Sequence, residues 1–485
     1  MGLDCSVEAN GEYLLMLKSI ETRGERFPWR IAFFLYTSSY GLVVFFLRAY
    51  FWDDWLVNYQ MSATEAKTYW ETQLGFFSLN RFIEVDLLHR NPTAFHLLTL
   101  IIFFLIPVVV FYILKYLPII NFKQRVYLVL ILLVLPINSA RFSMSTFRLS
   151  YSYLLFLVAW LVLVEKRTSR WKYLSLPLFL ISFLAQSLIP FFLLPCMHVV
   201  YLGYLKHGKI HSRFVLNSCL LFLLAPAYLV CGWVFDPPEG DRVAYFTPSI
   251  LGIIRALFVL SLATVLVVYS VARNHSQKRV WSSHNNLALA LFVTVLGSTA
   301  YMAAGRLVDI SEWMLNFVPR ASDWESRHQL LLGLGISFLI SVLIISLNIE
   351  VQKMTFFAVL GLCVVLNLSM MQGYFLDSLK QQQIILQIAN LDTASTWNSV
   401  TVVDEATVFN ARGRGIRSYE WEAMIQSATG NDHVLVSTSL PVCSVGQKQY
   451  VSELLIVGTG RGRFNATLKR DPGITLNHRT ILRCD

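Results

Sequence analysis

Residues 94–114 read AFHLLTLIIFFLIPVVVFYIL, and apolar side chains occupy almost the whole stretch. A helix of this length crosses the roughly 30 Å hydrocarbon core of a bilayer at about 1.5 Å per residue. Comparable runs recur along the 485-residue chain, in which 55% of residues are hydrophobic and 14% are charged. A soluble domain carries about 25% charge. The composition therefore excludes a soluble globular enzyme and predicts an all-α polytopic membrane protein.

About eleven such segments are predicted to cross the membrane: 31–49, 94–114, 126–138, 149–164, 173–186, 188–205, 214–235, 249–271, 287–304, 328–348 and 354–374. Basic side chains gather in the short loops 115–125, 166–172, 206–213 and 273–279. The longer loops are richer in acids and aromatics: 50–93, 139–148, 236–248 and 305–327. Positive charge marks cytoplasmic loops. We therefore expect a cytoplasmic N-terminus, with the four longer loops on the external face.

The net charge of +10 does not indicate a nucleic-acid partner. The basic residues lie in short loops between apolar runs, which is the pattern of the positive-inside rule. The predicted surroundings are a lipid bilayer, and the location that fits is the inner (plasma) membrane of a bacterium.

The parity of the crossings depends on residues 173–205, an apolar stretch with basic clusters at both ends. As a single span it would place one basic cluster outside and reverse every later loop. As a tight hairpin through Gln186 and Ser187 it keeps both clusters inside. Each arm then has about 16 residues, or roughly 24 Å, so at least one arm is short or recessed. We favour the hairpin; an ordinary pair of tilted helices is the alternative.

Composition changes after Phe375, which divides the chain into a transmembrane domain (1–375, including the external loop 50–93) and a C-terminal domain (376–485). Residues 381–391 extend the last helix. Alternating patterns predict strands at 400–404, 433–439 and 452–458, and a helix at 419–428. With eleven crossings, this small α/β domain lies on the external, periplasmic side.

Cys443 and Cys484 are the two cysteines of the C-terminal domain. An exported compartment permits disulfides, so we predict a bridge between them; two unpaired thiols are the alternative. Neither a Cys-x-x-Cys motif nor a Cys/His spacing of the kind that binds structural zinc is found in the sequence.

The sharpest local feature is Tyr50-Phe51-Trp52-Asp53-Asp54-Trp55, just past the first span. Acids so close to the hydrocarbon are functional or solvated; the alternative is an interfacial aromatic belt holding two solvated acids. The following loop is too long for a mere connector. Its residues 63–75 are predicted to form an interfacial amphipathic helix, ahead of the acids Glu84 and Asp86.

This arrangement resembles the GT-C superfamily of membrane glycosyltransferases, in particular bacterial enzymes that decorate O-antigen or similar surface glycans. The likeness covers a short cytoplasmic start, an acidic pair after the first span, a long first external loop, a many-span body and a C-terminal external domain. At the residue level it rests on Asp53 and Asp54. It implies transfer of a sugar from a polyprenyl-phosphate carrier to a glycan or lipid acceptor. In that family the first-loop acid is a general base or helps to hold a divalent cation (Mg or Mn), so Asp53 and Asp54 are the expected catalytic residues and metal ligands.

The chemistry needs a carboxylate and cations in any case. An acceptor hydroxyl must lose its proton as it attacks the anomeric carbon, and the phosphate leaving group develops negative charge. Arginine suits phosphate because its planar fork bonds bidentately. A helix starting near residue 328 would add a positive dipole end. The predicted donor-phosphate residues are Arg327, His328, Arg141, Arg148, Arg255 and Arg306. Snorkelling to lipid headgroups is the alternative for each arginine.

Tryptophans beside carboxylates suit a sugar, because an indole ring stacks on the sugar face while acids bond its hydroxyls. The predicted acceptor- or sugar-binding residues are Trp52, Trp55, Glu84, Asp86, Trp313 and Trp324. The glycine-containing segments 412–417 and 458–463 match neither a P-loop nor a Rossmann fingerprint, and we interpret both as surface turns.

Two other functions remain open at this point. A lipid-linked oligosaccharide flippase or transporter predicts ionisable residues along the spans and access from both faces. A surface-glycan polymerase or ligase of another architecture would also use outer arginines, but would lack the first-loop acidic pair. The sparse charge inside the predicted spans favours chemistry on one face.

Overall fold

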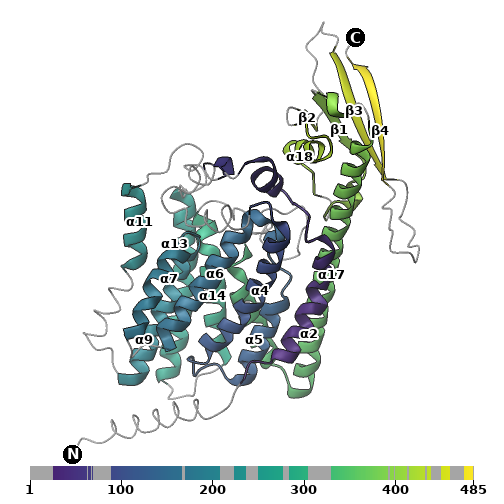
Figure 1. The fold of residues 1–485 in the computed structure, drawn as a ribbon. Coiled ribbons are helices and arrows are strands. Elements are labelled where there is room, and N and C mark those ends of the chain that lie inside the picture. Colours follow the sequence, from purple (N-terminus) through teal and green to yellow (C-terminus); the bar gives the residue numbers. More distant parts are fainter. Residues whose placement is uncertain are drawn as a thin grey trace, which may run out of the picture.

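The computed structural model is mostly helical, with a small sheet near its C-terminal end (Figure 1). It describes residues 26–62, 64–66, 68, 89–165, 170–207, 223–235, 250–276, 283–303, 329–391, 394–397, 399–411, 414–431, 434–438, 449–458 and 474–483.

Helices make up most of the described chain as far as residue 389. The α-helices are α2 (Trp29–Tyr40), α4 (Pro92–Leu114), α5 (Phe122–Val134), α6 (Phe147–Glu165), α7 (Ser175–Ser182), α8 (Leu188–Phe191), α9 (Leu193–His207), α11 (Leu224–Phe235), α13 (Ile250–Ser276), α14 (Ser283–Ala303), α16 (Leu332–Ile345) and α17 (Ile349–Ala389). The 3-10 helix η1 (Gly41–Phe46) continues α2, and the π-helical turn η2 (Trp55–Gln60) follows the acidic pair. Each predicted apolar segment overlaps one or more of these helices.

Five helical segments among the described residues are long and apolar enough to cross a membrane: Trp29–Phe46, Pro92–Leu114, Met144–Glu165, Asn285–Ala303 and Ile349–Ala389. Shorter apolar helices cover Leu188–Gly203, Gly252–Val267 and Leu332–Ile345. These long apolar helices are compatible with an integral membrane protein. The count of eleven crossings stays a prediction.

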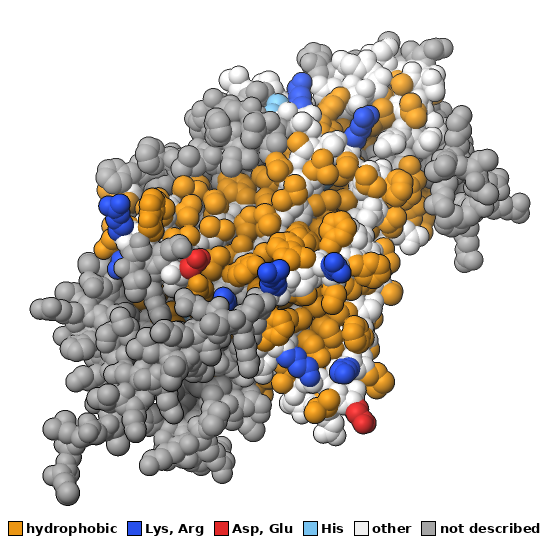
Figure 2. Space-filling model, turned by 60° about the horizontal axis from the view of Figure 1, so that its bottom comes forward, with side chains coloured by type: hydrophobic (Ala, Val, Ile, Leu, Met, Phe, Trp, Pro, Cys, Tyr) orange, Lys and Arg blue, Asp and Glu red, His pale blue; other side chains and the backbone are white. Residues whose placement is uncertain are grey.

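The surface of the bundle is apolar as well as its core. Figure 2 shows a broad hydrophobic area with few charged side chains among the described residues. Large side chains such as Phe34 (68% exposed), Phe258 (69%) and Phe357 (67%) point outward. So much exposed aromatic surface is unfavourable in water, whereas a lipid environment accommodates it.

The chain doubles back between α7 and α9, as the hairpin interpretation predicts. The rings of Phe179 and Phe192 lie 4.7 Å apart. Further along α9, His198 accepts the indole N–H of Trp160 at 3.1 Å and lies 3.3 Å from the carbonyl oxygen of Tyr116, near the end of α4. The eight residues of α7 span only about 12 Å, less than the thickness of a hydrocarbon core.

Helix α17 connects the two ends of the bundle. Its 41 residues extend for about 60 Å, twice the thickness of a hydrocarbon core. Near its start Phe356 stacks on Tyr127 of α5 at 3.8 Å, and further on Tyr374 packs on Phe46 at 5.8 Å. The last turns continue beyond the bundle to the sheet, at the end opposite the start of α2 (Figure 1).

The C-terminal elements are β1 (Ser399–Asp404), α18 (Ser418–Thr429), β2 (Leu435–Ser437), β3 (Gln449–Gly458) and β4 (Ile474–Arg483), and the sheet order is β2-β1-β3-β4. Strand β1 is parallel to β2 and β3, and β4 is antiparallel to β3. Strand β4 has no counterpart in the sequence prediction, because its polar residues interrupt the alternation of apolar ones.

Candidate active site

Asp54 is completely buried, and its carboxylate is saturated with hydrogen bonds. Oδ1 accepts from the hydroxyl of Ser143 (2.7 Å) and from both the N–H and the hydroxyl of Ser145 (2.8 Å each). Oδ2 accepts from the backbone N–H groups of Phe51 (3.2 Å) and Met144 (2.9 Å). Four of these five donors come from a loop about 90 residues further along the chain, so Asp54 joins that loop to the one after the first helix.

The loop that supplies four of these donors is shaped by two 3-10 turns, η5 (Ser139–Phe142) and η6 (Met144–Thr146). It begins at Asn138, whose φ of 52° is left-handed, a conformation that Asn tolerates better than most residues. The hydroxyl of Thr146 lies 2.9 Å from the carbonyl oxygen of Ser143 and closes the second turn. The backbone N–H groups of the turn therefore face Asp54.

His96 attaches the same two loops to helix α4. Its Nδ1 lies 3.0 Å from the carbonyl oxygen of Leu47, and its Nε2 lies 3.0 Å from that of Phe142. The side chain is buried. A carboxylate on one side and an imidazole on the other thus fix the loops at this end of the bundle.

Burial raises the pKa of Asp54 to about 6, and the hydrogen bonds from Ser143, Ser145 and Met144 oppose the rise. The group is therefore ionised at neutral pH and takes up a proton in mildly acidic solution. Because neither oxygen is exposed, we interpret Asp54 as the residue that holds the two loops together.

Asp53 differs from its neighbour in being only half-buried. Its Oδ1 accepts a hydrogen bond of 2.6 Å from the hydroxyl of Tyr419, which lies 366 residues away in the first turn of α18. Among the described residues, no group donates a hydrogen bond to Oδ2. Burial, together with the bond to Asp53, raises the pKa of Tyr419, so the phenol stays protonated.

Arg141 is a buried cation (4% exposed) among aromatic rings. Its guanidinium lies 4.3 Å from the ring centroid of Tyr40, 5.1 Å from that of Phe103 and 5.2 Å from that of Phe142. In the described part of the chain, neither Nε nor Nη2 has a hydrogen-bond acceptor. A desolvated guanidinium with free N–H groups favours an anionic ligand.

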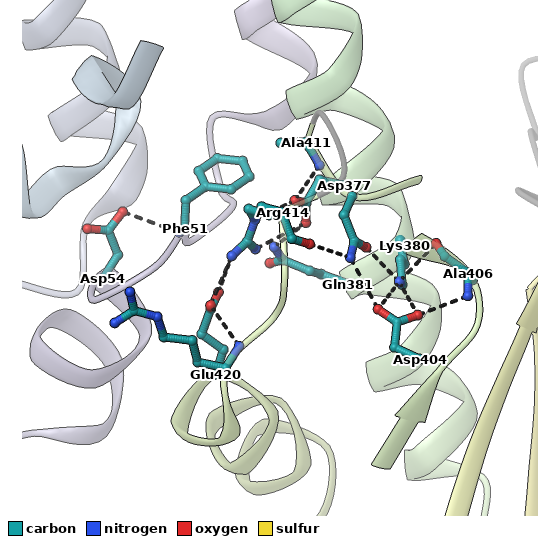
Figure 3. A network of polar contacts seen from close by, with 12 residues as sticks. Phe51, Asp54, Asp377, Lys380, Gln381, Asp404, Ala406, Ala411, Arg414 and Glu420 are labelled. Carbon is teal, nitrogen blue, oxygen red and sulfur yellow. Dashed lines mark hydrogen bonds and ion pairs between the residues drawn. The ribbon is translucent and has the colours of Figure 1, made fainter. Parts of the chain in front are cut away.

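A second buried charge cluster joins α17 to the start of α18 (Figure 3). Arg414 lies between two carboxylates: its Nε donates to Asp377 (2.7 Å) and its Nη1 donates to Glu420 (2.6 Å). Burial alone would lower the pKa of Arg414, but the two carboxylates outweigh it and raise the value. The interpretation of residues 412–417 as a surface turn is therefore wrong for Arg414, which is 1% exposed.

Lys380 continues this cluster one turn further along α17. Its Nζ lies 2.6 Å from both oxygens of Asp404, 2.6 Å from Oδ1 of Asn410 and 3.1 Å from the carbonyl oxygen of Ala406 (Figure 3). The last helix and the segment after β1 are thus joined by buried charge pairs as well as by apolar packing.

The two tryptophans next to the acidic pair are buried. Trp52 is 3% exposed with a φ of 54°, and its ring centroid lies 5.5 Å from the guanidinium of Arg414. Trp55 is 4% exposed and packs in the C-terminal apolar cluster with Trp397 and Trp421. In this arrangement both rings serve packing, and neither is open to a sugar.

The remaining predicted residues divide into two groups. Arg148 is half-buried in the first turn of α6, and Arg255 is exposed on α13. The others lie outside the described residues: Glu84, Asp86, Arg306, Trp313, Trp324, Arg327, His328, Cys443 and Cys484.

The acidic pair does not fit a divalent cation in this arrangement. Both oxygens of Asp54 are occupied by hydrogen-bond donors. The described residues contain no group of three or more His, Cys, Asp or Glu side chains that could hold a metal ion. We therefore derive no catalytic step through a metal.

Sequence reasoning missed Tyr419, the serines of loop 143–145 and the position of Arg414. The only local signal was Asn138-Ser-Ala-Arg141, a polar interruption between two apolar segments. The other contacts join positions tens to hundreds of residues apart.

In comparisons with known proteins, no protein-family model, curated protein or solved structure matches this chain.

Proposed function

We propose that this chain is a membrane glycosyltransferase that moves a sugar from a polyprenyl-phosphate carrier to a glycan or lipid acceptor. The observation that carries the proposal is that a half-buried carboxylate, Asp53, and a buried, incompletely paired guanidinium, Arg141, lie in two loops that are bonded to each other. Asp54 holds the loops of both residues together at one end of the bundle. A base and a phosphate-binding cation at one membrane face are the two groups that this reaction needs.

In the proposed reaction Asp53 is the general base. Its Oδ2 takes the proton of the acceptor hydroxyl as the oxygen attacks the anomeric carbon. The bond between that carbon and the phosphate oxygen breaks, and the negative charge that develops on the carrier phosphate is bound by Arg141. Asp54 supports the reaction by fixing the loops and does not touch the substrate.

The proposed orientation follows from the basic loops. The C-terminal sheet and the acidic pair lie on the external side of a bacterial inner membrane, and α2 begins at the cytoplasmic side. Eleven crossings with the α7–α9 hairpin satisfy this arrangement. The C-terminal α/β domain then covers the site from the external side.

The deciding experiment compares the wild-type chain with the Asp53→Asn variant, both purified in lipid nanodiscs. Each is incubated with a panel of synthetic polyprenyl-phosphate sugars, and donor consumption is followed by mass spectrometry. General-base catalysis contributes about 10² to 10⁴-fold, so turnover should fall by that factor while the protein stays folded. Glu405→Gln, an exposed acid near β1, is the matched control and should keep the wild-type rate.

The opposite outcome favours the transporter alternative. If the wild type and Asp53→Asn both leave every donor intact, and vesicles containing the chain move a lipid-linked oligosaccharide across the bilayer, the chain is a flippase. Mass spectrometry of surface glycans from cells with and without the chain identifies the sugar in either case.

A further inference from the structure

Tyr419 contacts the proposed base through a short, charge-assisted hydrogen bond. The 2.6 Å between the phenol oxygen and Oδ1 of Asp53 lies in the range of O–H···O⁻ bonds, which are about twice as strong as neutral ones. The donor comes from the C-terminal part of the chain, whereas the acceptor follows the first helix. The bond therefore joins two parts of the site that are far apart in the sequence.

The backbone on both sides of Tyr419 is fixed. The preceding loop and Glu420 are held by Arg414, whose Nη1 lies 2.9 Å and 2.6 Å from the two carboxylate oxygens of Glu420. On the other side Trp421 is 1% exposed in the apolar cluster that also contains Trp55. The phenol is thus presented to Asp53 from a rigid helix turn.

The backbone around Asp53 is equally constrained. Asp54 is held by five donors, and Trp52 packs against Arg414. The two side-chain torsions of Asp53 are then the remaining freedom at this position. A single hydrogen bond to Oδ1 fixes them, and it leaves Oδ2 available for another donor.

We infer that Tyr419 is a positioning residue for Asp53, which orients the carboxylate so that Oδ2 meets the acceptor hydroxyl; the inference rests on the function proposed above. The phenol is not consumed and does not touch the reacting atoms. Because burial and the neighbouring carboxylate raise the pKa of Tyr419, it donates throughout the range in which a carboxylate base works.

The test is the turnover of Tyr419→Phe in the nanodisc assay, with a synthetic polyprenyl-phosphate sugar as donor. Misplacement of a reacting group by about 1 Å can cost about 10²-fold. We therefore expect kcat to fall by about 10- to 100-fold while KM for the donor changes little. Tyr59→Phe removes the same hydroxyl from a ring that packs 5.3 Å from Trp55, and it should behave as wild type.

A double variant separates positioning from folding. If Tyr419 acts through Asp53, then Tyr419→Phe should slow the Asp53→Asn variant no further, because coupled residues are non-additive. Additive losses with a lowered melting temperature would show a merely structural role and overturn the inference.

The remaining outcomes separate a failure of the inference about Tyr419 from a failure of the proposed function. If Asp53→Asn loses turnover while Tyr419→Phe keeps the wild-type kcat, this inference is wrong and the proposed function stands. A faster Tyr419→Phe enzyme would also overturn it, since the phenol would then be blocking the base. If wild type and Asp53→Asn do not differ, the proposed function fails and the inference fails with it.

Discussion

Oδ1 of Asp54 lies 2.8 Å from both the backbone nitrogen and the hydroxyl oxygen of Ser145, 91 residues further along the chain. An amide at position 54 would place an N–H group against these donors. We expect Asp54→Asn to lower the free energy of unfolding by about 3 kcal/mol at pH 7, because buried donors are left without an acceptor. Thermal unfolding in detergent measures this. Glu405→Gln, which removes an exposed carboxylate, should change stability by less than about 0.5 kcal/mol.

Stability should also depend on pH through Asp54. Burial raises its pKa from 3.8 to about 6, so between these values the folded state binds more protons than the unfolded state. The contribution of Asp54 to the unfolding free energy therefore decreases as the pH rises from about 4 to about 6, by about 3 kcal/mol in all, and is level above that. The melting-temperature gap between wild type and Asp54→Asn should narrow over this window. A gap independent of pH would contradict the raised pKa.

A variant of Arg141 should lose activity without losing stability. Replacing a buried, incompletely paired charge by an apolar residue of similar volume is often neutral or stabilising, so Arg141→Met should melt no lower than wild type. If the guanidinium binds the donor phosphate, loss of that contact should reduce the rate of donor consumption by tenfold or more when the donor concentration is limiting.

The control for Arg141 is Arg30→Met, an exposed arginine at the other end of the bundle, which should leave donor use unchanged. Wild-type donor use by Arg141→Met would show that the phosphate binds elsewhere.

The Arg414 cluster should be intolerant of single changes. Arg414→Met leaves Asp377 and Glu420 buried without their shared cation, and breaking a buried pair costs about 3–5 kcal/mol. Neutralising both acids as well (Asp377→Asn, Glu420→Gln) should recover part of that loss, because the uncompensated charges are gone. Unfolding measurements on the single and triple variants check this, with the exposed Arg417→Met as the control. A single variant as stable as wild type would mean that the cluster contributes little.

The orientation of the chain in the membrane can be determined with a cysteine-labelling reagent that does not cross membranes. Val408 is 78% exposed, close to the sheet, and Arg30 is exposed at the start of α2. In a cysteine-free background, Val408→Cys should react in intact cells, whereas Arg30→Cys should react only after lysis. The reversed pattern would place the acidic pair on the cytoplasmic side and remove the eleven-crossing topology.

The helices were predictable because hydropathy is a local property. Runs such as 94–114 had to become helices, since an unpaired backbone is not tolerated in hydrocarbon. The extension of the last helix and strand β1 followed from periodicity in the same way. Strand β4 was missed because pairing with β3, rather than its own pattern, determines it.

The site was predictable only in part, because its contacts are not local. The acidic pair stood out by its position after an apolar run. The different surroundings of the two acids could not be foreseen, since Asp54 meets Ser145 whereas Asp53 meets Tyr419. Arg414, between two glycines in the sequence, looked exposed because its carboxylate partner Asp377 is 37 residues away.

The hydrogen bond between Asp53 and Tyr419 also has a consequence for biosynthesis. The acid leaves the ribosome 366 residues before its partner, a delay of roughly 20 to 70 s at about 5 to 20 residues per second. Throughout that time the first loop is in place without the helix that orients it. A nascent or prematurely terminated chain would therefore insert into the membrane and still be inactive, so that activity appears only in chains whose last helix has docked.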